Sequence, residues 1–172
     1  MQKTGLENGK RPIIPIPRSG FEKAVEALAI LGVLMSFYLL IASYSDLPEK
    51  IPMHYGFGGK PDAYGGKWTI VALPVIGLAL YAGMSLIRKI PHYYNYPWPI
   101  TKENAPEMYR ISIVMITCVK MEVVWLFTYI QWMTVRVGMG KSQGLGALLL
   151  PVTFVVLAVT VIVAVFQMRR VK

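Results

Sequence analysis

Four long apolar stretches constrain what this chain can fold into. A helix needs about 20 predominantly apolar residues to cross the roughly 30 Å hydrocarbon layer of a membrane. The stretches that reach this length are Ala24–Tyr44, Trp68–Ile87, Ile111–Val135 and Gly146–Met168. Together they take about half of the chain, which leaves little room for a separate soluble domain. The sequence therefore predicts an all-α fold, an integral membrane four-helix bundle.

Capping signals and breaks in the apolar pattern set the expected bounds of the helices. Ser19 and Glu22 have the spacing of a capping box, and Asn104 followed by Pro106 is typical of a helix start. These signals predict helices over about 20–44, 68–88, 105–136 and 146–168 in a single transmembrane domain of residues 19–172, after a proline-rich lead-in of residues 1–18. We expect the opening turns of the first helix, with Glu22 and Glu26, to stay in the headgroup layer.

The basic residues of the chain, which carries a net charge of +9, gather at the ends of the apolar stretches. This placement argues against a nucleic-acid partner and favours anionic lipid headgroups. Twelve Lys and Arg residues lie on the side of the two termini and five on the other side, with Lys120 inside a stretch. The positive-inside rule then predicts a multi-pass protein of the cell membrane with both termini in the cytoplasm.

The segment between the first two helices, expected outside the cytoplasm, carries the most specific motif. It contains Leu-Pro at 47–48, Ile-Pro-x-His-aromatic at 51–55 and Gly-x-Pro-Asp at 59–62, then a Gly and a Lys before the next helix. This pattern, with its flanking helices over about 28–86, resembles the family known as domain of unknown function sixteen-forty-eight. The matching residues are Pro48, Pro52, His54, Gly59, Pro61, Asp62, Gly66 and Lys67.

The resemblance implies a membrane domain with an ordered extracytoplasmic loop. The same domain forms the first part of SdpI-type proteins, which resemble immunity factors against a secreted peptide toxin and also signal to a repressor. The last two expected helices do not match the SdpI-specific region. The resemblance thus implies the loop and its helices, and leaves immunity or signalling as an expectation.

Three roles are open for His54 and Asp62 in this loop. Prolines fix the loop backbone and glycines permit its turns, so the two side chains can hydrogen-bond and hold a rigid cap. They can instead bind a divalent cation with Glu49 or Asp46, since imidazole with carboxylates suits zinc or manganese. They can also help the loop to recognise a peptide or a lipid headgroup.

The sequence offers no arrangement typical of an enzyme or a cofactor site. Both Gly-Lys pairs are followed by Pro61 or Trp68 where a P-loop requires Ser or Thr. Cys118 is the single cysteine, which excludes an intramolecular disulfide and a cysteine-based metal cage. His54 and His92 are expected on opposite faces of the bilayer, so they cannot share a metal ion. We therefore expect a protein without catalysis and without a cofactor.

Polar residues inside the third apolar stretch form a second candidate site: Lys120, Glu122 and Gln131. Inserting a charge at the centre of a membrane helix costs at least about 2.5 kcal/mol, so such residues normally have partners. Lys120 and Glu122 lie roughly 200° apart around a helix and need separate partners. Three interpretations stay open. They are an ion, proton or ligand site, an interface with another subunit, and a structural contact with Ser36, Tyr38 or Ser43 of the first helix or with a nearby thiol or hydroxyl.

These observations leave three classes of function for a protein whose first partners are membrane lipids. The leading hypothesis is a non-enzymatic sensing or immunity protein that recognises a peptide ligand through the loop of His54 and Asp62. The second is an accessory subunit of a larger membrane protein complex. The third is a small transporter or membrane enzyme that uses Lys120 and Glu122.

Overall fold

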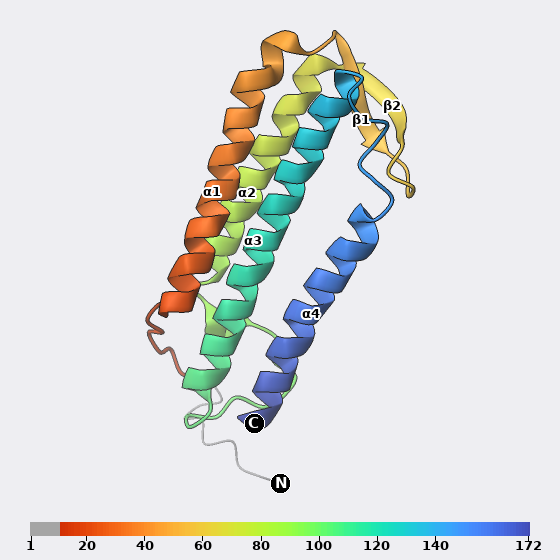
Figure 1. Ribbon diagram of the computed structural model, residues 1–172. Helices are drawn as coiled ribbons and strands as arrows, with labels where there is room; N and C mark the ends of the chain where they lie inside the picture. Colours follow the sequence, from red (N-terminus) through yellow and green to blue (C-terminus); the bar gives the residue numbers. More distant parts are fainter. Residues whose placement is uncertain (1–10) are drawn as a thin grey trace.

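The computed structural model describes residues 11–172, which contain four long helices (Figure 1). They are α1 (Gly20–Ser43), α2 (Ala72–Ile87), α3 (Ala105–Gly138) and α4 (Leu149–Arg170). Each is long and apolar enough to cross a membrane when the short 3-10 turns next to α1 and α2 are included. The chain therefore has the helices of a multi-pass membrane protein.

The helix α3 is the centre of the bundle. It packs against α1, α2 and α4, whereas α4 packs mainly against α3. The helices α1 and α3 run in the same direction, and α2 runs in the opposite direction (Figure 1). Residues 11–19, which contain no helix or strand, lie at the same end of the bundle as the C-terminus. The first ten residues of the predicted lead-in lie outside the described part of the chain.

A two-stranded antiparallel sheet caps the opposite end of the bundle, which corrects the all-α prediction. Strand β1 (Lys50–Tyr55) pairs with β2 (Pro61–Gly66), and the register shifts on both sides of His54. The turn closes through a hydrogen bond from the Gly56 amide to the Lys60 carbonyl at 3.0 Å. Pro52 and Pro61 cannot donate to the ladder, but in a two-stranded sheet each strand has a free edge that tolerates them.

The helix ends differ from the predicted ones where the local hydrogen bonding differs. The 3-10 turns η2 (Tyr44–Asp46) and η3 (Lys67–Val71) flank the sheet, so the second helix is α-helical only from Ala72 rather than from residue 68. Ser19 caps α1 by accepting from the Glu22 amide at 3.1 Å. Asn104 does not cap α3 with its side chain, which instead accepts from the Thr101 amide at 2.8 Å.

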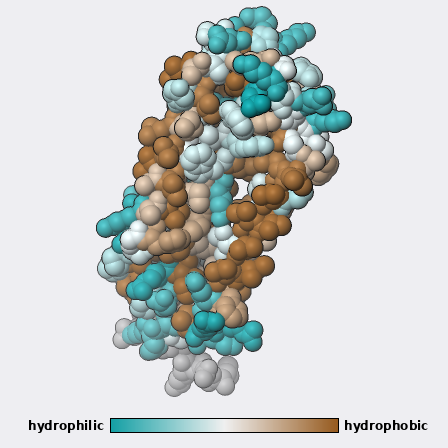
Figure 2. Space-filling view, viewed as in Figure 1, coloured by the Kyte–Doolittle hydropathy of each residue, from teal (hydrophilic) through white to brown (hydrophobic). Residues whose placement is uncertain are grey.

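Apolar side chains cover the middle of the molecule and polar ones gather at its two ends (Figure 2). Buried apolar clusters lie near each end. One joins α3 to α4 around Met108, Tyr109 and Met168, and the other packs Ile51 of β1 and Leu47 against the far end of the bundle. Between them many large apolar side chains are exposed, as expected where lipid rather than water is the solvent.

Candidate functional site

Lys120 lies in a polar cluster that joins three helices. Its ammonium group donates to both carboxylate oxygens of Glu26 on α1 and to the Ser85 hydroxyl on α2, each at 2.9 Å. The Tyr81 hydroxyl donates to the same carboxylate at 2.7 Å, and the Tyr81 ring centre lies 4.6 Å from the ammonium nitrogen. An ammonium group has three donors, and three acceptors face this one. These contacts favour a structural link over a mobile charge.

The three residues of the first helix that were candidate partners do not contact Lys120, although a nearby hydroxyl, that of Ser85, does. Of the three first-helix candidates, Ser36 pairs with Gln131, Ser43 donates to its own helix at the Leu39 carbonyl, and Tyr38 is exposed. A carboxylate of this chain was not among the predicted partners, and Glu26 supplies one. A buried ammonium group requires an opposite charge, because hydroxyl groups alone compensate only part of its lost hydration.

Glu22 forms a second buried ion pair, one turn before Glu26 on the same face of α1. Its carboxylate accepts from Nε of Arg88 at the end of α2, and Nε of Arg18 lies 3.8 Å away. Both acids are buried between helices. Their depth in the headgroup layer stays a prediction. Residues four apart share one face of a helix. The spacing of these two acids in an apolar helix is the sequence feature that could have predicted their buried ion pairs.

Polar contacts continue along α1 and α3 toward the sheet. The Thr128 hydroxyl donates to the Gly32 carbonyl at 3.1 Å, and the Gln131 side-chain amide donates to the Ser36 carbonyl at 2.9 Å. The Ser36 hydroxyl also donates to the Gln131 side chain. We call this whole interface the polar seam: Glu22, Glu26, Gly32 and Ser36 of α1, Ser85 and Arg88 of α2, and Lys120, Thr128 and Gln131 of α3. Small and polar residues of this kind hold membrane helices together, because lipid provides no hydrophobic driving force.

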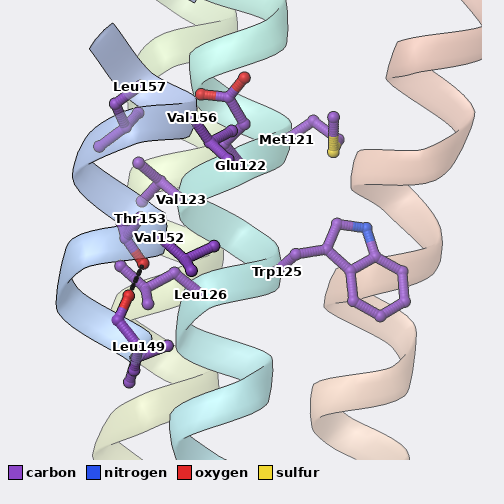
Figure 3. A pocket seen from close by; sticks show the side chains of 10 residues that line it. All are labelled: Met121, Glu122, Val123, Trp125, Leu126, Leu149, Val152, Thr153, Val156 and Leu157. Carbon is purple, nitrogen blue, oxygen red and sulfur yellow. Dashed lines mark hydrogen bonds between the residues drawn. The ribbon is translucent and has the colours of Figure 1, made fainter. Parts of the chain in front are cut away.

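Glu122 lies on the other side of α3 and faces α4. One of its carboxylate oxygens accepts from the Thr160 hydroxyl at 2.5 Å. The other oxygen is buried and has no hydrogen-bonding partner among the described residues. The carboxylate lies at one end of a cavity between the two helices (Figure 3). Glu122 is thus an acid in an apolar setting with half of its hydrogen-bonding capacity unused.

His54 and Asp62 meet on the sheet, Nδ1 to Oδ1 at 2.5 Å, with both side chains exposed. Within residues 11–172, no three His, Cys, Asp or Glu side chains gather as a metal site would require. The two acids weighed as further ligands have other contacts, since Glu49 pairs with Lys67 at 3.0 Å and Asp46 accepts from a neighbouring serine. The arrangement favours a hydrogen-bonded pair that steadies the hairpin.

The other motif residues build the hairpin and its junction with α2. The Lys67 amide donates to the Glu49 carbonyl at 3.0 Å, parallel to the ion pair of their side chains. A Cβ on Gly66 would lie 2.8 Å from the Trp68 indole, so a larger residue here would have to displace that side chain. The motif prolines and the remaining glycine divide by burial: Pro48 is exposed, Pro61 is half-buried, and Pro52 and Gly59 are buried.

The hairpin is tied to the bundle at two places. The Tyr55 hydroxyl donates to the Thr134 hydroxyl of α3 at 3.0 Å, and burial raises the pKa of Tyr55 above its usual value. At the hairpin tip, the Leu145 amide in the α3–α4 turn donates to the Gly59 carbonyl at 2.7 Å. The Leu145 carbonyl in turn accepts from Tyr129 of α3 at 2.9 Å. The tip therefore holds the turn from which α4 begins.

Comparison with known proteins yields two matches. Residues 31–78 match the family described as Domain of unknown function (DUF1648). A curated protein of Archaeoglobus fulgidus, described as an uncharacterized protein, is 29% identical over 93 residues, which are 49% of this chain and 51% of the relative. The chain thus spans about half the length of this relative. No solved structure matches the chain. The family match covers the hairpin and the adjoining parts of α1 and α2, and it stops before α3.

Proposed function

We propose that this chain is a small non-enzymatic membrane protein whose hairpin, on the extracytoplasmic side, recognises a membrane-active peptide in an SdpI-like sensing or immunity role. The observation that carries the proposal is the two-faced hairpin. One face is anchored to the bundle and the other presents aromatic and apolar side chains. The proposal also rests on the motif resemblance and on the orientation that the basic residues predict.

The two faces of the hairpin differ sharply in exposure. Ile51 is fully buried against the bundle, whereas Phe57 at the tip is 96% exposed. Met53, Tyr64 and the neighbouring Trp68 are also largely exposed. Exposed apolar side chains grouped on a polar loop mark a contact surface for a protein or a membrane. Aromatic anchors of this kind dominate the binding energy of peptide interfaces.

The contacts of the tip supply a route for a signal. A ligand that displaces the tip also disturbs the hydrogen bond between Leu145 and Gly59, and with it the start of α4. Because the four helices cross the membrane in the proposed topology, a movement of α4 reaches the cytoplasmic end. The hairpin then serves as the receiving element and α4 as the responding one.

A binding experiment with full-length protein in lipid nanodiscs tests this function. The probe is a fluorescently labelled amphipathic peptide toxin, titrated against protein-containing and empty discs. Wild-type protein should bind the peptide in excess of the empty discs. Phe57→Ser should weaken binding about tenfold, the effect of losing one buried aromatic anchor. Tyr93→Ser removes an exposed aromatic ring at the opposite end of the molecule and should change nothing.

Two outcomes would contradict the proposal. Binding equal to that of empty discs would show that the protein does not recognise the peptide. Equal binding by wild type and Phe57→Ser would show that the tip of the hairpin does not take part in recognition. His54→Ala adds a second probe of the same surface, because it removes the exposed pair with Asp62 while the buried face of the hairpin stays intact.

A second candidate function, an accessory subunit, is favoured by the exposure of α4. Only 6% of the most apolar stretch of α4 is buried within the chain, against 39% of the corresponding stretch of α3. Phe154 and Ile162 are among its exposed side chains. A partner helix could cover this face in place of lipid. Purification from native membranes in mild detergent tests the idea, and a protein that remains a single polypeptide would argue against it.

A further inference from the structure

We propose that the cavity between α3 and α4 binds a hydrophobic amine, with the ammonium group of the ligand paired to Glu122. This site lies on the opposite side of α3 from the polar seam, and it is independent of the role proposed for the hairpin. Figure 3 shows the Glu122 side chain between the two helix ribbons, at one end of the cavity.

The cavity has the size and lining of a small ligand site. Its volume is about 310 Å³. This is about twice the volume of an apolar cavity of 150 Å³ that binds benzene, so it accommodates two small rings or a chain of about ten carbons. Apart from Glu122 and Thr153 its lining is apolar: Met121, Val123, Trp125 and Leu126 of α3, and Leu149, Val152, Val156 and Leu157 of α4.

Glu122 supplies the charge that selects the ligand. Thr160 satisfies one carboxylate oxygen, and the other is buried without a partner among the described residues. Buried acids in proteins are nearly always paired, because a lone carboxylate loses its hydration without compensation. An ammonium group donates to the unused oxygen and neutralises the charge at the same time. A neutral alcohol of the same shape can donate a hydrogen bond to this oxygen but leaves the charge uncompensated.

The depth of Glu122 decides between sources of the amine. Glu122 and Thr160 lie near the middle of their helices, about as far as the chain allows from either membrane surface. A lipid headgroup stays at the surface, so the ammonium group must belong to a molecule that dissolves in the hydrocarbon layer. Entry is open from the lipid, since α4 is almost entirely exposed along its length.

Photolabelling of the full chain in zwitterionic lipid nanodiscs tests the site. The probe is decylamine that carries a diazirine on its chain, and the matched probe is the corresponding decanol, which has the same body without the charge. The amine should label residues that line the cavity, such as Val156 and Leu157, and excess unlabelled decylamine should abolish this labelling. Labelling by the alcohol at these residues should be about tenfold weaker, because its hydroxyl can hydrogen-bond to the carboxylate but carries no opposite charge.

Three variants distinguish the contribution of the Glu122 charge from that of the cavity volume. Glu122→Gln should lower labelling by the amine about tenfold, to the level of the alcohol. Glu103→Gln removes an exposed acid outside the helices and should label like wild type. Val156→Trp fills the cavity, keeps Glu122, and should lose labelling by both probes.

The following results would contradict the proposed amine site. Equal labelling of wild type and Glu122→Gln would show that charge plays no part. Labelling spread over lipid-exposed positions of α1 and α2, without competition, would show that the cavity only holds lipid chains. Unchanged labelling of Val156→Trp would place the ligand elsewhere. A second polypeptide that cross-links to Glu122 through a basic side chain would assign the carboxylate to a partner helix.

Discussion

At the scale of single residues, Lys120 and Glu26 depend on each other. Each is a buried charge whose main compensation is the other, with Ser85 and Tyr81 as additional contacts. Removing one member of such a pair leaves an uncompensated charge, whereas removing both leaves a polar but neutral site. The stability of the interface of α1, α2 and α3 therefore responds to these positions in a strongly non-additive way.

The first prediction concerns this pair. Lys120→Met should lower the free energy of unfolding by about 3–5 kcal/mol, because the Glu26 carboxylate stays buried without its cation. The double change Glu26→Leu with Lys120→Met should recover most of that loss. Thermal unfolding in detergent micelles measures both. Lys89→Met, which removes an exposed lysine at the end of α2, is the control and should stay close to wild type.

If Lys120→Met and Lys89→Met had the same unfolding temperature, the ion pair would not be a link between helices.

A second prediction concerns two tyrosines in the segment between α2 and α3. Burial is the main cause that raises the pKa of Tyr94 and of Tyr96 to about 12. Their hydroxyls donate to the Ile87 and Pro91 carbonyls at 2.8 and 2.9 Å, and tyrosinate could not donate these bonds. The unfolded chain loses these protons near pH 10, so above that pH it binds fewer protons than the folded chain.

The stabilisation from Tyr94 and Tyr96 is consequently complete below about pH 10 and disappears as the pH rises toward 12. Ultraviolet absorbance of tyrosinate follows the ionisation, and unfolding temperatures measured over the same range follow the stability. Replacing both residues by Phe should flatten the loss of stability in this range. An equally steep loss in the double variant would assign the alkaline sensitivity to other groups.

At the scale of elements, the contact between the hairpin tip and the α3–α4 turn is made by backbone alone. Gly59, with a φ of +71°, approaches Gly144 and Gly146 so closely that side chains would not fit. A Cβ on Gly59 would lie 2.8 Å from the Gly146 carbonyl oxygen, and one on Gly144 would overlap the Gly59 carbonyl. The contact is therefore very sensitive to a single methyl group.

Gly144→Ala tests this contact. The methyl group should push the tip away from the turn at a cost of about 1–3 kcal/mol, the usual range for overpacking. Amide hydrogen exchange should then speed up at Leu145, whose amide binds the Gly59 carbonyl. Gly58→Ala is the matched control, because a Cβ there meets nothing within 4 Å. Equal exchange at Leu145 in both variants would refute a tight contact.

The sequence could predict the four helices, but not the two strands or the side-chain contacts between helices. Apolar length alone identified four helices, since no other regular segment hides its backbone in lipid. The two strands were missed because Pro52 and Pro61 interrupt the alternation that marks a strand. The partnership of Glu26 with Lys120 was missed because it joins residues 94 apart in sequence. Their pairing depends on which way α1 and α3 run and how they are staggered, and no local pattern contains that information.

At the scale of the whole molecule, the proposed topology places the hairpin outside the cell and both chain ends inside. A membrane-impermeant amine reagent applied to intact cells should modify Lys60 at the hairpin and leave Lys172 untouched, while permeabilised cells should show both modified. Lys60 is exposed, so its labelling reports topology rather than burial. Modification of Lys172 with protection of Lys60 in intact cells would invert the orientation.

The polar seam has a consequence for how the protein is made. The ribosome delivers α1 before α3, so Glu22 and Glu26 leave the ribosome well before Lys120 exists. Both acids lie in the first two turns of α1, which the predicted topology places near the membrane surface, where water can solvate them during this interval. The end of α2 then supplies Arg88 to Glu22, and α3 supplies Lys120 to Glu26. The seam is therefore complete only after the third span has been made, because Lys120 is the last of the partners of Glu22 and Glu26 to be synthesised.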